Sequence, residues 1–266
     1  SIIIGKNVTV IGRFAFSGCT ELSSIEIPDG VRSIGELAFD NCSNLESINV
    51  GDDNQYYSSE EGVLYDNGKT KIIQCPLGKT GSLTVARGVS SIDNYAFRSC
   101  VKITSVAFGN EVKSIGVGAF YNCLGLNAIT LPESIDSIGD MAFYKCSNLL
   151  NISIPSNITR IGVQTFADCE GLRDVKIPEG VASISKGAFM DCIGLAEVTV
   201  PSTVRSLGRG AFSRCGNLER VTFLGNAPSA SADTFGGTSP TIYYNSERQG
   251  WGDTFAGLTA KAISSE

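Results

Sequence analysis

Cysteine is the residue type in this sequence with the most chemistry to offer, and its spacing is regular. Eight of the nine cysteines fall in two runs with an interval of 23 residues: Cys19, Cys42, and then Cys100, Cys123, Cys146, Cys169, Cys192 and Cys215. A thiol can form a disulfide, bind a metal ion or act as a nucleophile. The sequence contains no histidine, so the usual general base and the commonest metal ligand are both missing.

The neighbours of these cysteines favour a structural role. Each periodic cysteine has Phe three residues before it and Leu or Ile three residues after it, and a buried thiol behaves as a small hydrophobe. We therefore predict an internal ladder of reduced thiols. Disulfides between repeats and a metal site remain alternatives, although no CxxC pair occurs and zinc would need thiolates from separate repeats. Cys75 lies outside the series and is the predicted exposed or reactive thiol. No metal and no cofactor are predicted.

The cysteines mark one position of a longer repeat, VxxIGxxAFxxCxxLxxIxIPxxG. A period of 20 to 29 residues with LxxIxI at one edge is typical of a leucine-rich-repeat solenoid, in which each coil contributes one short strand. The sequence predicts a right-handed, leucine-rich-repeat-like coil with a parallel β-sheet on one side and 23-residue repeats over residues 1–224.

In most copies of the repeat, glycine follows the Ile of the VxxIG segment. We predict that these glycines form a backbone corner with positive φ, where a Cβ atom would clash. They are Gly12, Gly35, Gly116, Gly139, Gly162 and Gly208.

Two segments depart from the repeat. Residues 51–85 form a longer variant repeat, in which Asp66-Asn67-Gly68 between two β-prone runs predicts a β-hairpin. This hairpin either projects from the solenoid or forms part of its wall. Residues 225–266 are predicted to be a degenerate last coil followed by a C-terminal cap that contains Trp251.

Composition excludes several classes of function. The 27 Asp and Glu exceed the 21 Lys and Arg, giving a net charge of −6, so nucleic acid is not an expected partner. No apolar run approaches the roughly 18 residues of a membrane span, so direct membrane insertion is not expected. Nucleotide-binding and nucleophile-elbow motifs are absent, and we predict that the protein is not an enzyme. The first residues lack signal-peptide features; a signal peptide is either absent or, as we expect, already removed.

The outward positions of the predicted strands are the best candidates for a binding site. The last three coils place charges of both signs there, an arrangement that confers orientation and specificity at protein interfaces. Solubilising surface charge is the alternative explanation. The predicted binding residues are Arg173, Asp174, Lys176, Glu197, Glu219 and Arg220, and the alternative aromatic site near the hairpin comprises Tyr56, Tyr57 and Tyr65.

Residues 27–50 (IPDGVRSIGELAFDNCSNLESINV) and 177–200 (IPEGVASISKGAFMDCIGLAEVTV) resemble the BspA-like class of leucine-rich repeats. The inserted GVLYDNGKTKIIQCPLGK and the closing GNAP, TFGG and TIYYN segments resemble sequences that accompany those repeats. The resemblance implies a bacterial protein at the cell surface or secreted, which acts as an adhesin on a protein ligand such as host extracellular matrix or plasma protein. An architectural stalk without a ligand of its own is the alternative.

Overall fold

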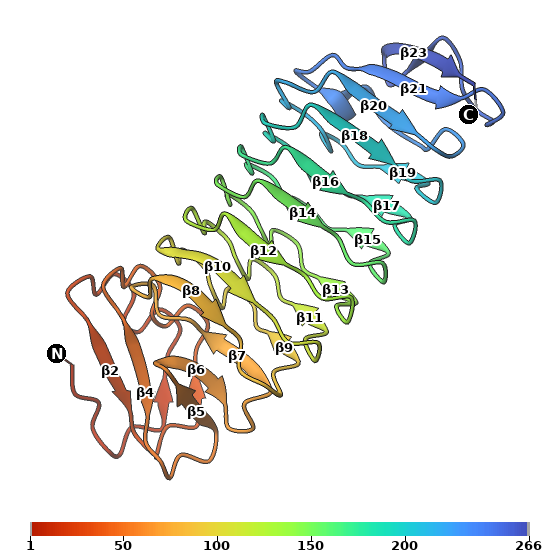
Figure 1. The fold of residues 1–266 in the computed structure, drawn as a ribbon. Helices are drawn as coiled ribbons and strands as arrows, with labels where there is room; N and C mark the ends of the chain where they lie inside the picture. The colour runs from red at the N-terminus through yellow and green to blue at the C-terminus, as the bar shows by residue number, and fades with distance from the viewer. Residues whose placement is uncertain (1, 265–266) are drawn as a thin grey trace.

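The computed structural model describes residues 2–264 as a β-solenoid of about ten turns, which runs as a rod from the N-terminal to the C-terminal end (Figure 1). Each regular coil contributes one longer strand to the wall of the rod and one two-residue strand to a second side. The longer strands are β2 (Ser24–Ile27), β4 (Ser47–Val50), β8 (Gly81–Thr84), β10 (Ile103–Ala107), β12 (Ala128–Thr130), β14 (Asn151–Ser153), β16 (Asp174–Lys176), β18 (Glu197–Val200) and β20 (Arg220–Phe223).

The two-residue strands come from the Ser-Ile or equivalent pair in the first half of the repeat. They are β1 (Val10–Ile11), β3 (Ser33–Ile34), β9 (Ser91–Ile92), β11 (Ser114–Ile115), β13 (Ser137–Ile138), β15 (Arg160–Ile161), β17 (Ser183–Ile184) and β19 (Ser206–Leu207). Pairing between neighbouring regular coils is parallel in both sets, as in β15 with β17 and β18 with β20.

The period of the sequence fixes the register of the wall. Glu197 pairs with Arg220 and Val198 with Val221, in each case 23 residues apart. In β18 the valines are buried and the alternate residues Glu197 and Thr199 are exposed. A one-residue slip would turn the valines to solvent, so the apolar pattern specifies this register.

The other half of each coil packs a continuous column of aromatic rings into the core. From Phe97 to Phe235, successive rings of the repeat stack at centroid separations of 4.7 to 5.6 Å. The neighbouring thiols form the predicted ladder: Cys123 donates to the carbonyl of Phe97 at 2.9 Å and Cys146 to that of Phe120 at 3.2 Å. All nine cysteines are free. The internal thiol ladder is confirmed by this geometry.

The prediction that the repeat glycines have positive φ is wrong. Gly35, Gly139 and Gly208 lack positive φ; instead, a Cβ atom on each would lie 2.3 to 2.5 Å from a backbone nitrogen of the preceding coil. Glycine is required there because two coils approach closely. The left-handed residues lie two positions before and two after the repeat Phe, as at Met141 (φ 57°) and Lys145 (φ 59°) on either side of Phe143.

The variant repeat forms an antiparallel meander of β5 (Tyr57–Glu60), β6 (Val63–Asp66) and β7 (Lys71–Gln74). The predicted hairpin is present, and it does not project from the solenoid: β7 pairs in parallel with β9, so the meander continues the sheet of two-residue strands on the second side of the rod. The turn of the hairpin is closed by a hydrogen bond of 3.0 Å that the Lys69 amide donates to the Asp66 carbonyl. Lys69, with φ 50°, rather than Gly68, adopts the left-handed conformation, as in three-residue loops built on a type I turn.

This meander divides the interior of the rod into two hydrophobic cores. Leu64 packs with the core of the first two coils, whereas Val63 and Tyr65 pack with the core of all later coils. Strand β6 is therefore buried on both faces, because successive side chains along a strand point to opposite sides.

After β20 the chain forms a short 3₁₀ helix, η1 (Ala232–Phe235), and then β21 (Thr241–Asn245), β22 (Thr254–Phe255) and β23 (Leu258–Ile263). β21 pairs with β20 and β23 pairs with β21, both in parallel. Trp251 stacks on Tyr244 at 4.8 Å and contacts Phe223 and Phe255. Among residues 2–264, no helix is long and apolar enough to cross a membrane.

Candidate binding surface

The six charged residues predicted for binding lie together on the wall at the C-terminal half of the rod. All six are exposed; they come from β16, β18 and β20 or from the residue just before one of these strands. Beneath them Val175, Val198 and Val221 are buried. The packed aliphatic side chains hold the strands rigid, so the spacing of the charges is fixed by the coil repeat.

These charges are free to pair with a partner. Within residues 2–264, none of the six forms an ion pair with another side chain of the chain. Arg220 makes an aromatic contact: its guanidinium lies 3.9 Å from the centroid of the Tyr243 ring. Such stacking orients the guanidinium while leaving its N–H groups available.

Tyr243 was missed by the sequence analysis. It lies on β21 beside Thr222, only 21 residues further along the chain, so counting in steps of 23 does not bring it to this surface. The aromatic composition of the TIYYN segment was the available signal. With Arg220 and Tyr243 together, the surface has an aromatic contact as well as charges of both signs.

The alternative site near the hairpin is only partly accessible. Tyr56 is 47% exposed, but the hydroxyl of Tyr57 accepts a hydrogen bond from the Ile34 amide at 2.9 Å. Tyr65 is 3% exposed, and burial raises its pKa to about 12. The prediction of Tyr65 as a surface contact is wrong, because β6 is covered on both faces. Tyr56 is the remaining candidate there.

The prediction of Cys75 as an exposed thiol is also wrong. Its side chain is fully buried, and its amide donates to the Ala96 carbonyl at 2.7 Å. In the next coil, the Phe97 amide makes the equivalent hydrogen bond to the Ala119 carbonyl. Cys75 therefore occupies the position that Phe holds in the regular repeats. Cys19 is the partly exposed cysteine.

The buried thiols are poor nucleophiles. Burial raises the pKa of Cys146, Cys169 and Cys192 well above the ordinary value, and that of Cys215 to about 12. A thiol must be ionised to attack or to bind a metal. Across the described part of the chain, no three metal-ligating side chains gather at one place.

Comparison with known proteins agrees with this architecture. The family model for the BspA type leucine rich repeat region matches residues 1–81, 74–195 and 136–246, with six copies. The fold is similar to that of a leucine-rich repeat protein from Eubacterium ventriosum, with a TM-score of 0.68 and 26% identity over 81% of this chain and 64% of that one. No curated protein sequence matches.

Two further structures extend the comparison. A leucine rich cell surface protein from Faecalibacterium prausnitzii has a TM-score of 0.59 and 30% identity, over 88% of this chain and 56% of that one. The pneumococcal vaccine antigen PcpA has a TM-score of 0.64 and 21% identity, over 91% and 55%, and shares the fold. The chain spans less than two thirds of the length of each of these proteins.

Proposed function

Because the chain belongs to the BspA type leucine-rich repeat family, we propose that it is a non-enzymatic protein-binding module, adhesin-like, at the cell surface or secreted. Its ligand is a protein of the host extracellular matrix or plasma. The binding surface is the charged group on the last coils: Arg173, Asp174, Lys176, Glu197, Glu219 and Arg220, together with Tyr243.

One observation carries this proposal. Six exposed charges lie on the β-wall, and within residues 2–264 none of them forms an ion pair with another side chain. Repeat solenoids bind partners along such extended walls, and unpaired charges of both signs favour one orientation of a protein partner. The relative named as a cell surface protein supports the proposed location.

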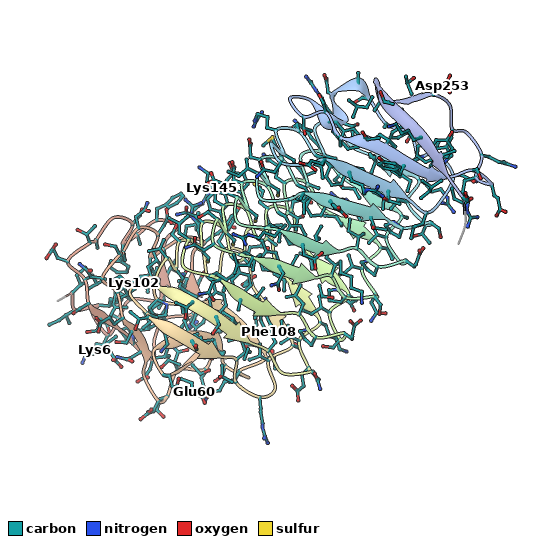
Figure 2. The ribbon with its side chains drawn as sticks, turned by 45° about the horizontal axis from the view of Figure 1, so that its top comes forward. Lys6, Glu60, Lys102, Phe108, Lys145 and Asp253 are labelled. Atoms are coloured by element: carbon teal, nitrogen blue, oxygen red, sulfur yellow. The ribbon has the colours of Figure 1, made fainter. Side chains whose placement is uncertain are left out.

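The test is binding of the purified chain to immobilised host matrix and plasma proteins, with two triple alanine variants. The first replaces Arg173, Asp174 and Lys176. The control replaces Lys102, Glu111 and Lys113, which are also exposed. Like the first variant, it removes two positive charges and one negative charge. Lys102 lies in the N-terminal half of the rod, far from the end where Asp253 lies (Figure 2).

We expect saturable binding that the first variant weakens about tenfold, equivalent to about 1.4 kcal/mol, while the control variant binds normally. Equal loss in both variants would indicate non-specific charge attraction and contradict the proposed surface. A loss with Tyr56→Ala alone would transfer the site to the hairpin. Absence of binding to every protein tested would favour the architectural stalk, for which the uninterrupted stack of later coils is suited.

A further inference from the structure

Within residues 2–264, three arginine side chains lie over aromatic rings. Such a contact orients the plane of the guanidinium group and leaves its N–H groups available for an anion. The pairs, with the distance from the guanidinium carbon to the ring centroid, are Arg13 with Phe14 (4.7 Å), Arg98 with Tyr121 (5.0 Å) and Arg220 with Tyr243 (3.9 Å).

In two of these pairs the arginine also holds a carboxylate. Arg98 binds Asp40 at 3.0 Å, and Arg13 lies 3.6 Å from Glu36. Arg220 differs, because within residues 2–264 it forms no ion pair and its side chain donates no hydrogen bond. It is oriented by a ring as the other two are, and the carboxylate is the component that the chain itself does not supply.

A second positive side chain lies on the other side of Tyr243. Strand β23 pairs with β21, and Lys261 is the register partner of Tyr243. Ile242 and Ala260, which precede them, are buried, so Tyr243 and Lys261 both lie on the outer face of the wall. Lys261 is exposed and forms no ion pair among the described residues. The ring is thus flanked by positive residues from both neighbouring strands, Arg220 and Lys261.

We propose that Arg220, Tyr243 and Lys261 form an anchor that holds a glutamate or aspartate side chain of the protein ligand. This inference rests on the proposed function, because it names the chemical group of the ligand that the charged surface binds. A guanidinium group offers two parallel N–H donors that match the two oxygens of a carboxylate. Lys261 adds a second positive charge, and it thereby joins the residues of the binding surface.

The neighbouring acids favour a single carboxylate over a polyanion. Glu219 precedes Arg220 in the chain, and Glu197 is the register partner of Arg220 on β18. Both acids are exposed. A sulfated polysaccharide carries negative charge along its length and would be repelled by these acids, whereas a protein segment can place a basic residue beside its acidic one. The ligand segment therefore has lysine or arginine close to the anchored carboxylate.

The first experiment uses acetyl-Lys-Glu-Lys-amide as the probe and NMR of the isotope-labelled full chain as the measurement. In about 0.15 M salt, we expect saturable shifts at the Arg220 Nε–H group and at the Tyr243 and Lys261 amides. The peptide acetyl-Lys-Gln-Lys-amide lacks the carboxylate and is expected to bind at least about fivefold less tightly. No shift at these three residues, or equal binding of the two peptides, would overturn the proposal.

A heparin hexasaccharide tests the polyanion. At the same salt concentration, we expect it to leave the signals of Arg220 and Lys261 unchanged. Saturable shifts at both residues, with tighter binding than that of the glutamate peptide, would overturn the assignment of a single carboxylate.

Three variants test the parts of the anchor. We expect Arg220→Met to weaken binding of the glutamate peptide about tenfold, and Lys261→Met about threefold. Tyr243→Leu changes no charge, so a loss of about threefold would show that the ring positions the guanidinium. Unchanged binding in Arg220→Met would overturn the proposal, and unchanged binding in Tyr243→Leu would overturn the role of the ring.

The matched controls are exposed residues of the same types elsewhere on the rod: Arg87→Met, Lys102→Met and Tyr56→Leu. Neither Arg87 nor Lys102 forms an ion pair within residues 2–264. We expect all three controls to bind the glutamate peptide normally. Equal losses in the controls and in the anchor variants would indicate non-specific charge attraction and overturn the anchor.

The peptide probe does not depend on the identity of the host protein, so the two proposals can fail separately. Normal peptide binding without binding to any matrix or plasma protein would contradict the proposed function and support the anchor. Binding to a matrix protein that is unchanged by Arg220→Met and by Lys261→Met would overturn the anchor and leave the proposed function intact.

Discussion

Arg98 donates from Nε to Oδ1 of Asp40 at 3.0 Å, although 58 residues separate them in the sequence. The bond spans the variant repeat and ties the second coil to the first coil of the later series. Asp40 is 8% exposed, and the Arg98 guanidinium also lies 5.0 Å from the Tyr121 ring. This contact links the two parts of the rod on either side of the variant repeat.

Removing this ion pair tests its contribution to stability. We expect Arg98→Met to lower the free energy of unfolding by about 1.5 to 3 kcal/mol, because the buried Asp40 carboxylate loses a charged donor. Arg13→Met breaks the exposed pair with Glu36, 3.6 Å apart, and is expected to cost at most about 1 kcal/mol. Urea unfolding curves of both variants give the comparison; equal losses would contradict a special role for Asp40.

We expect a glycine to tolerate replacement by alanine only where no neighbouring coil lies close to its Cα atom. A Cβ atom on Gly139 would lie 2.5 Å from the Val117 nitrogen, whereas none of the surrounding atoms lies within 4 Å for Gly216. We expect Gly139→Ala to destabilise by about 1 to 3 kcal/mol and Gly216→Ala to change stability by less than about 0.5 kcal/mol. Thermal unfolding measures both; a neutral Gly139→Ala would refute the close-approach explanation.

Thiol labelling distinguishes the ladder from its alternatives. At pH 8 in the folded protein, we expect iodoacetamide to modify Cys19 and to leave the eight buried cysteines intact. In denaturant without reductant, mass spectrometry should count nine modified thiols. A lower count in denaturant would reveal disulfides, and rapid labelling of Cys75 in the folded chain would contradict its burial.

Alkaline pH is expected to unfold the protein through its buried acids. Tyr65 and Cys215 both have pKa values raised to about 12 by burial, from ordinary values of 10.0 and 9.0. The folded state thus favours their neutral forms, so their contribution is complete below about pH 9 and is lost as the pH rises to about 12. We expect Tyr65→Phe to reduce the loss of stability between pH 10 and 12, measured by urea unfolding at each pH. An unchanged pH dependence would exclude Tyr65 as a contributor.

The sequence was sufficient to predict the solenoid because one period determines both the register and the core. A 23-residue step superimposes Glu197 on Arg220 and Phe143 on Phe166, so pattern and structure coincide wherever the step is kept. The thiol ladder followed for the same reason. The role of the repeat glycines did not follow, because the sequence shows that a side chain is disfavoured there without showing whether φ or a neighbouring coil is the cause.

Prediction was least accurate where the step changes. In the variant repeat, β6 is enclosed on both faces, so Val63, Leu64 and Tyr65 are all buried. The sequence did not show that this strand lies between two cores, and Tyr65 was therefore expected at the surface. Cys75 is at a Phe position that the spacing of cysteines cannot reveal.

Because β6 belongs to both hydrophobic cores, it governs how the rod responds to tension. The hydrogen bonds that join successive coils lie along the axis of the rod. Tension along this axis therefore acts directly on these bonds and separates the coils one after another. Within residues 2–264, the Leu37, Phe39 and Asn41 amides of the second coil donate to no backbone carbonyl, so this coil is held to the later ones by β4, the meander and the Arg98–Asp40 pair. We expect the rod to part first at this junction, leaving the later coils folded as a block that still presents its charged wall.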